Sequence, residues 1–362
     1  MTDPRVSTRN TNISRILNSV LIVVIIAFVG VLAWKHLRPG KAAPPAPKPW
    51  EIPAGGTRSL ATLNGHTSAV WCTAITPDGK YIFSGDGNVV KRTDDVVNVW
   101  NAETGQLFAT LDGHRGSVIG LAVTPDGKNL LSASFDRTVR VWSLPPRPGR
   151  DSTFVREFIG HGSSVLSLAV TQDGKYVVSG GFDGAIRVWR LADGVCVRVM
   201  EQAHTFGVSS VTLTPDGTYL VSGGNDHAVR IWRFSDLSPV RTITTHDDDV
   251  NSVAVSTDGK YIVSGAQNGF VGVWRFEDGS MVHYFQAHLM SLMTVVFSPD
   301  GNYFLTGSLN NRVRVWSMKD GKKVEEYHEH RGAVSSITIT PDGKRIITGS
   351  NDGTLKIWSP PW

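Results

Sequence analysis

Eleven histidines are the residues of this sequence that could most readily ligate a metal ion or act as general bases. Seven of them recur at regular positions along the chain: His66, His114, His161, His204, His246, His288 and His330. Each is followed by a tryptophan 28 positions later, or 34 in the first case. Such an interval, repeated over most of the chain, predicts a structural role, because metal sites bring ligands together at short spacing.

The remaining candidates for chemistry are weaker. His227, His283 and His328 are isolated and lack the spacing of metal ligands. Asp247-Asp248-Asp249 lacks the alternating acidic pattern of calcium loops, so we expect a solvated acidic loop. Cys72 and Cys196 lie in apolar strand patterns and are expected to be buried free thiols. The sequence therefore predicts no catalytic residue, cofactor, metal or small-molecule substrate, and a protein that is not an enzyme.

The repeat unit contains four short strand patterns. The repeat tryptophans are Trp100, Trp142, Trp189, Trp232, Trp274, Trp316 and Trp358, separated by 42 to 47 residues. Turns such as Thr124-Pro-Asp-Gly127 link two apolar runs in each unit, and alternation such as Ile186-Arg-Val-Trp189 has the period of a strand. This period and content predict an all-β fold, a seven-bladed β-propeller with four-stranded blades over residues 58–362.

The repeats resemble those of the WD-repeat propeller family. A hydroxyl residue occurs in each repeat before the tryptophan: Ser84, Ser132, Ser179, Ser222, Ser264, Thr306 and Thr348. A turn residue stands six positions before it: Asp94, Asp136, Asp183, Asp226, Asn268, Asn310 and Asp352. The resemblance implies a buried hydrogen-bond chain from histidine, hydroxyl, turn carboxylate and tryptophan in each blade. It is incomplete, because no repeat has Asp directly after its tryptophan.

The ends of the repeat region suggest how the ring closes. Only four residues follow Trp358, too few for a fourth strand, while residues 58–63 form a spare strand pattern before His66. The resemblance implies that this spare strand pairs with the last blade. Closure of that kind removes the exposed edges of an open array.

The first 57 residues differ from the repeats. A short basic tail, residues 1–15, precedes 19 almost entirely apolar residues at 16–34, enough for one transmembrane helix. Residues 35–57 are rich in proline and form a semi-rigid linker. We expect a signal anchor with the tail inside and the propeller outside. The alternative is a cleaved signal peptide and a secreted or periplasmic propeller.

The charge of the repeat domain argues against nucleic-acid binding. The whole chain has a formal charge of +4, but seven of its 36 basic residues lie in residues 1–57. The repeat domain carries 29 basic and 30 acidic residues. It therefore lacks the basic surface of a nucleic-acid-binding protein.

One rim of the expected propeller carries unusual side chains. In the resembling family, the histidine loops and the turn-Asp loops lie on one rim, here called the top rim. The Pro-Asp-Gly turns and the loops after each tryptophan lie on the bottom rim. The top-rim candidates for partner binding are Phe135, Phe182, Phe206, Leu289, Met290, Leu309, Lys91 and Arg92. We expect a membrane-anchored scaffold for protein or peptide partners; the alternatives are an architectural subunit of a membrane complex and a propeller enzyme.

The apolar segment gives a first prediction. The full chain should resist extraction by carbonate or high salt and require detergent, because a span of 19 residues is held by the hydrophobic effect and not by charge. Membrane fractionation followed by N-terminal sequencing checks this. A soluble mature chain that starts at Trp34 would show a cleaved signal peptide instead.

Overall fold

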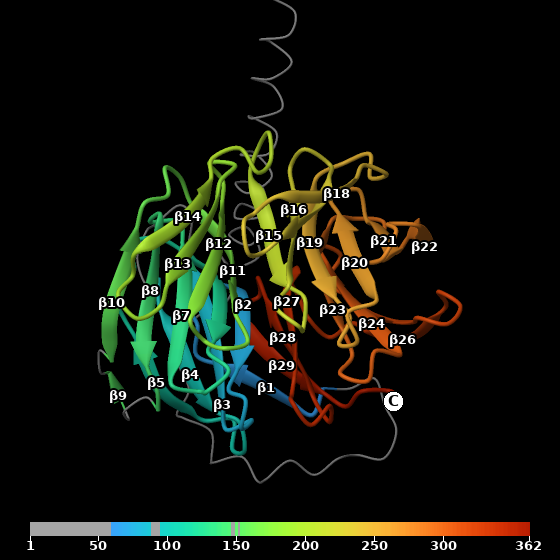
Figure 1. The fold of residues 1–362 in the computed structure, drawn as a ribbon. Helices are drawn as coiled ribbons and strands as arrows, with labels where there is room; N and C mark the ends of the chain where they lie inside the picture. The colour runs from blue at the N-terminus through green and yellow to red at the C-terminus, as the bar shows by residue number, and fades with distance from the viewer. Residues whose placement is uncertain (1–58, 88–94, 146–148, 151–152) are drawn as a thin grey trace, which may run out of the picture.

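Seven antiparallel sheets are arranged in a ring, as a seven-bladed propeller (Figure 1). The computed structural model describes residues 59–87, 95–145, 149–150 and 153–362. Among these residues, no helix is long and apolar enough to cross a bilayer. The tail, the expected transmembrane helix at 16–34 and the linker all lie outside the described residues.

The first three blades are as follows. Blade 1 contains β2 (Ala69–Ile75), β3 (Tyr81–Gly87), β4 (Val97–Asn101) and β5 (Leu107–Leu111), with the short β9 (Gly149–Arg150) parallel to β5. Blade 2 contains β6 (Val118–Val123), β7 (Asn129–Ser134), β8 (Thr138–Ser143) and β10 (Phe154–Ile159). Blade 3 contains β11 (Val165–Val170), β12 (Tyr176–Gly181), β13 (Ile186–Arg190) and β14 (Cys196–Met200).

The other four blades follow the same order. Blade 4 contains β15 (Val208–Leu213), β16 (Tyr219–Gly224), β17 (Val229–Arg233) and β18 (Pro239–Ile243). Blade 5 contains β19 (Val250–Val255), β20 (Tyr261–Ala266), β21 (Phe270–Arg275) and β22 (Met281–Gln286). Blade 6 contains β23 (Leu292–Phe297), β24 (Tyr303–Ser308), β25 (Val313–Ser317) and β26 (Lys323–Tyr327). Blade 7 contains β27 (Val334–Ile339), β28 (Ile346–Ser350), β29 (Thr354–Trp358) and β1 (Ala61–Asn64).

The hairpin between the first two strands of each blade is fixed by the turn sequence. In blade 2, Thr124 Oγ1 donates to Asp126 Oδ1 at 2.6 Å, and Gly127 N–H donates to Thr124 O at 2.8 Å. Gly127 has φ of +68°, which glycine adopts without a steric cost. The turn types predicted from the sequence therefore form the bottom rim.

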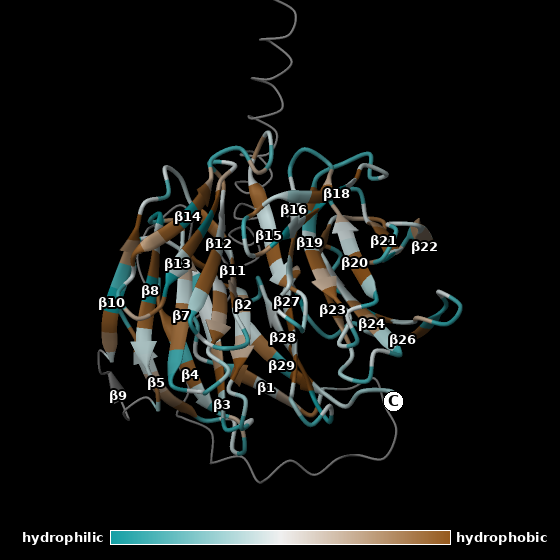
Figure 2. Ribbon diagram, viewed as in Figure 1, coloured by the Kyte–Doolittle hydropathy of each residue, from teal (hydrophilic) through white to brown (hydrophobic). Residues whose placement is uncertain are grey.

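The core lies between neighbouring sheets. Figure 2 shows hydrophobic strands joined by mainly hydrophilic loops. Between blades 2 and 3, for example, Leu131 and Val139 of one sheet pack with Val165 and Trp189 of the next. All four are almost fully buried. Each blade thus depends on its neighbour for burial, which explains why the ring must close.

Hydroxyl groups near the inner strands connect several blades. Val211 N–H donates to Ser167 Oγ at 3.0 Å, and Val253 N–H donates to Ser210 Oγ at 3.1 Å. In the same way, Thr73 N–H of blade 1 donates to Ser336 Oγ of blade 7 at 3.0 Å. These bonds satisfy backbone donors that face a neighbouring sheet.

Strand β1 closes the ring. It pairs with β29, from Ala61 opposite Ile357 to Asn64 opposite Thr354. The sequence predicts this strand at residues 58–63, whereas it spans 61–64. Among the described residues before it, the N–H of Leu60 extends the pairing and donates to Ile357 O at 2.7 Å. The chain therefore enters blade 7 at the bottom rim and runs to the top rim at His66.

The expectation that both cysteines are buried was wrong for Cys196. Cys72 is buried, and burial raises the pKa of its thiol above the usual range. Cys196, however, is exposed on the outermost strand of blade 3. An alternating apolar pattern did not imply burial there, because an outer strand has no further sheet beside it.

Ring closure gives a second prediction. The fragment 58–362 should fold, whereas fragment 67–362, which lacks β1 and His66, should melt at least roughly 5 °C lower. The loss combines the buried Leu63 with one strand pairing. Calorimetry of the two fragments decides, with Leu63→Ala in 58–362 as an intermediate control. Equal melting temperatures would refute the role of β1.

Candidate protein-binding face

A buried chain of hydrogen bonds positions the two top-rim loops of each blade. In blade 2, Trp142 Nε1–H donates to Ser132 Oγ at 2.8 Å, and His114 Nε2 lies 2.7 Å from the same oxygen. His114 Nδ1 lies 2.7 Å from Asp136 Oδ2. One proton arrangement satisfies all three contacts: tryptophan to serine, serine to histidine, histidine to carboxylate. The carboxylate also accepts the N–H of Arg115 at 3.0 Å, so the histidine loop is tied to the turn.

The shared hydroxyl occurs in all seven blades, including the first with its longer interval. Histidine Nε2 lies 2.6–2.8 Å from it. Tryptophan Nε1–H donates to it at 2.7–2.9 Å. We call the whole chain of contacts in a blade, from tryptophan through the hydroxyl and histidine to the turn residue, the relay. Because its polar atoms satisfy one another, the buried histidines have structural partners.

The carboxylate of blade 1 differs from the sequence prediction. Asp86 Oδ2 lies 2.7 Å from His66 Nδ1, and its Oδ1 accepts the N–H of Val96 at 2.9 Å. The predicted residue, Asp94, lies outside the described residues. Counting back from Trp100 pointed to Asp94 because the insertion of this repeat falls between the carboxylate and the tryptophan.

Charge in the relay depends on the turn residue. Burial would raise the pKa of Asp136, but hydrogen bonds from His114, Thr138 and the N–H of Arg115 outweigh it and hold that pKa well below its usual range. In blade 5, Asn268 accepts the N–H of Phe270 at 3.2 Å, and His246 Nδ1 has no hydrogen-bond partner among the described residues. Burial lowers the pKa of His246 to about 4. Blade 5 thus lacks the last link of the relay.

Three apolar candidates occupy one repeated top-rim position. The N–H groups of Phe135, Phe182 and Leu309 each donate to the histidine loop of their own blade, at 3.0, 2.8 and 3.0 Å. The same position is Asn225 in blade 4 and Gln267 in blade 5, so the fold does not require an apolar residue there. All three apolar side chains are half-buried and present part of their surface to solvent.

The loops that carry Phe182 and Phe206 meet at the border between blades 3 and 4. A Cβ added to Gly207 would lie 3.0 Å from Cδ2 of Phe182, so glycine allows this ring to pack against the next loop. Phe206, which precedes that glycine, is also half-buried. Phe135, Phe182 and Phe206 thus belong to three consecutive blades, and we call them the aromatic arc.

The blade 6 candidates are more exposed. Leu289 is 86 % exposed and Met290 is 50 % exposed. Exposing the apolar side chains of leucine and methionine to water is unfavourable. Their exposure at a loop tip is therefore typical of a contact site. Lys91 and Arg92 lie outside the described residues.

The border between blades 4 and 5 is polar. Asp249 Oδ2 accepts a hydrogen bond from Asn225 Nδ2 at 3.0 Å, and its Oδ1 lies 3.5 Å from His227 Nε2. Asp249 is only 6 % exposed, so the expectation of a solvated loop was wrong for this residue and holds for the exposed Asp247. His227 is likewise not isolated in space. The sequence could not show this, since Asn225 and Asp249 are 24 positions apart in the chain.

His227, Asp248 and Asp249 are also the one group of described residues whose atoms converge closely enough to hold a metal ion, all within 4.8 Å. The contacts with Asn225 and His227 already account for Asp249 without a metal.

One aromatic residue of the top rim, Trp71, is not among the candidates predicted from the sequence. Trp71 of β2 is half-buried, and its Nε1–H donates to Gly87 O at 3.1 Å. It has no counterpart among the repeat tryptophans, and that departure from the repeat is the signal that could have identified it.

Comparison with known families agrees with this geometry. Residues 154–356 match the family described as SPT8 beta propeller. The chain belongs to this β-propeller family. Residues 57–101 and 105–143 match the family described as WD domain, G-beta repeat. No curated protein matches the chain. The WD-repeat propeller predicted from the sequence is thereby confirmed, and such propellers typically serve as protein-interaction scaffolds.

The incomplete relay of blade 5 gives a third prediction. Asn268→Asp should offer His246 Nδ1 a charged acceptor and stabilise the propeller by about 1 kcal/mol, a rise in Tm of roughly 2 °C. A carboxylate whose pKa is depressed on folding stabilises above its unfolded pKa of about 3.9, so the gain should be present at pH 7 and fade below pH 4. Calorimetry against pH measures it.

The reverse exchange is the control. Asp136→Asn in blade 2 should lower Tm, since it removes the charge that holds His114. A lower Tm for Asn268→Asp at pH 7 would contradict this account of the relay.

Proposed function

We propose that this chain is a membrane-anchored, non-catalytic scaffold that binds a protein or peptide partner on its top rim. The observation that carries the proposal is the aromatic arc together with Leu289 and Met290. These apolar side chains lie on loops that other blades build with polar residues. Aromatic residues that remain partly exposed on a rigid surface are typical anchors of protein interfaces.

A non-catalytic role is supported by the hydrogen bonds of the relay histidines and by the burial of Cys72. The relay histidines are each bonded to a serine or threonine, and six of the seven also to an aspartate or asparagine. Burial gives Cys72 a raised pKa, which removes the thiolate that a nucleophile needs.

The path of the chain supports an orientation. The chain enters blade 7 at the bottom rim, next to Ile357. If residues 16–34 cross the membrane, the anchor pulls on that rim, and the top rim faces away from the bilayer. A proline-rich linker of 23 residues permits tilting but keeps the top rim accessible.

The arc gives a fourth prediction. Phe135→Ala combined with Phe182→Ala should weaken partner binding at least tenfold, or about 1.4 kcal/mol, because two interface anchors are lost. The full chain is tagged, extracted in mild detergent and compared with wild type by quantitative mass spectrometry of co-purified proteins. The affinity of the main partner is then measured with both variants.

A bottom-rim aromatic provides the matched control. Phe276 packs against Tyr219 on the opposite rim, with ring centroids 5.3 Å apart. Phe276→Ala should cost stability and leave binding unchanged. If the double arc variant retains full affinity, the site is elsewhere. A fixed-stoichiometry complex that is insensitive to the top rim would favour an architectural subunit.

A further inference from the structure

The bottom rim contains a repeated socket between neighbouring blades. Each socket lies between the residue that opens the second strand of one blade and the loop after the tryptophan of the next. Between blades 3 and 4, Tyr176 contacts Phe234, with ring centroids 6.4 Å apart. Between blades 4 and 5, Tyr219 contacts Phe276 at 5.3 Å. An aromatic pair thus fills these sockets.

The end of the chain fills a socket in another way. Between blades 6 and 7, Trp362 stacks on Tyr303, with centroids 5.5 Å apart and planes 19° from parallel. Its Nε1–H donates to Gly343 O at 3.1 Å, in the Pro-Asp-Gly turn of blade 7. A socket can therefore accept an indole supplied from outside the repeat, with a carbonyl ready for its N–H.

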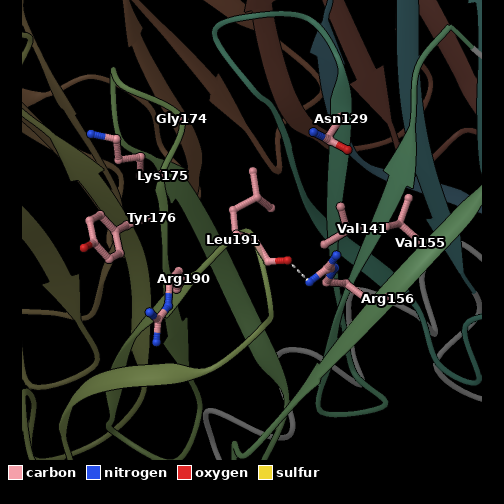
Figure 3. Close-up of a pocket in the computed structure, with 10 residues that line it drawn as sticks. Asn129, Val141, Val155, Arg156, Gly174, Lys175, Tyr176, Arg190 and Leu191 are labelled. Carbon is pink, nitrogen blue, oxygen red and sulfur yellow. Dashed lines mark hydrogen bonds between the residues drawn. The ribbon is translucent and has the colours of Figure 1, made fainter.

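Two sockets have no aromatic residue in either position, and a groove is open at each. Between blades 7 and 1, Arg345 and Ala102 take the two positions, beside a groove of about 510 Å³. Arg345 Nη1–H donates to Ala102 O at 3.1 Å and bridges this socket. Between blades 2 and 3 the positions are Asn129 and Leu191, beside a groove of about 420 Å³ (Figure 3). We call the latter the open socket.

The open socket has a carbonyl and a cationic border. Gly174 O is the counterpart of the carbonyl that accepts the Trp362 indole, and Gly174 lines the groove. Arg156, Lys175 and Arg190 also line it (Figure 3). Arg156 donates through Nη1 to Ala192 O, but its buried Nε has no hydrogen-bond partner among the described residues.

The other two cationic side chains, Lys175 and Arg190, form ion pairs that an incoming carboxylate can replace. Lys175 Nζ lies 3.4 Å from Asp173, and Arg190 Nε lies 3.2 Å from Asp193. All four side chains are about half exposed or more, and exposed ion pairs of this kind contribute little. An incoming carboxylate can therefore compete for either cation.

We propose that the open socket is a second docking site, for a partner segment in which an aromatic residue, best tryptophan, is adjacent to an acidic one. The ring occupies the space that Tyr176 fills in the next socket and that the smaller Asn129 leaves open here, and the carboxylate faces the cationic border. This site is on the bottom rim and is independent of the aromatic arc. Its success or failure leaves the proposed top-rim function untouched.

The probe is a blocked dipeptide, acetyl-5-fluorotryptophanyl-glutamate amide, titrated by fluorine NMR into the full chain in mild detergent. A single aromatic anchor with one ion pair should bind with a Kd of roughly 1 mM. The lysine analogue of the probe should bind at least fivefold more weakly.

The open socket can be filled by introducing the tyrosine and phenylalanine pair that fills the neighbouring socket. Asn129→Tyr with Leu191→Phe should reduce probe affinity at least tenfold without lowering Tm. Ala102→Phe, the same kind of substitution in the other unfilled socket, should leave it unchanged. Lys175→Ala with Arg190→Ala should abolish the preference for glutamate, and both residues are exposed enough to leave the fold intact.

Three results would overturn the proposal. They are no binding of the glutamate probe at millimolar concentration, unchanged affinity in the closed-socket variant, and equal binding of the glutamate and lysine probes to the wild-type chain.

Discussion

The hydroxyl group shared by a histidine and a tryptophan is the contact on which this structure depends. An indole N–H, an imidazole and a hydroxyl would each be costly to bury alone, and in the relay each satisfies the next. Because the chain of contacts runs from the buried tryptophan to the top-rim turn, it transmits the rigidity of the sheets to the loops that carry the candidate binding residues. Blade 5, where His246 lacks its last partner, is where this coupling is weakest.

The two rims of the ring have different physical characters. On the top rim, relay bonds fix the loop backbones, so that side chains such as Phe182 are free to differ from blade to blade. On the bottom rim, aromatic pairs such as Tyr219 and Phe276 fill the space between blades and contribute to packing. A departure from the repeat therefore differs between the rims. On the top rim it places an apolar side chain where other blades have a polar one, and on the bottom rim it leaves a socket without an aromatic residue.

Much of the fold could be predicted because a propeller repeats its signals. The regular tryptophans, the Pro-Asp-Gly turns and the spare strand before His66 each have a direct physical meaning, and together they specify the number of blades and the means of closure. The prediction was wrong or incomplete where a repeat is irregular. The insertion in blade 1 hid the role of Asp86, and the exposure of Cys196 follows from its place on an outer strand.

The site was harder to predict than the fold. Spacing could assign Phe135 and Phe182 to the top rim, but it could not show that Asn225 and His227 converge on Asp249 from another loop. Nor could it show that Asn129 leaves a socket open, since this depends on the packing of two blades. Contacts between blades are set by tertiary geometry, and a repeat pattern describes only what happens within one blade.

Site-specific photo-crosslinking in intact membranes tests the central claim most directly. A benzophenone amino acid at position 182 on the top rim is compared with one at position 302, an exposed bottom-rim turn of blade 6. A scaffold that binds through its top rim should give a discrete crosslinked partner from position 182 and none from position 302. The same partner captured from position 302 alone would contradict the account.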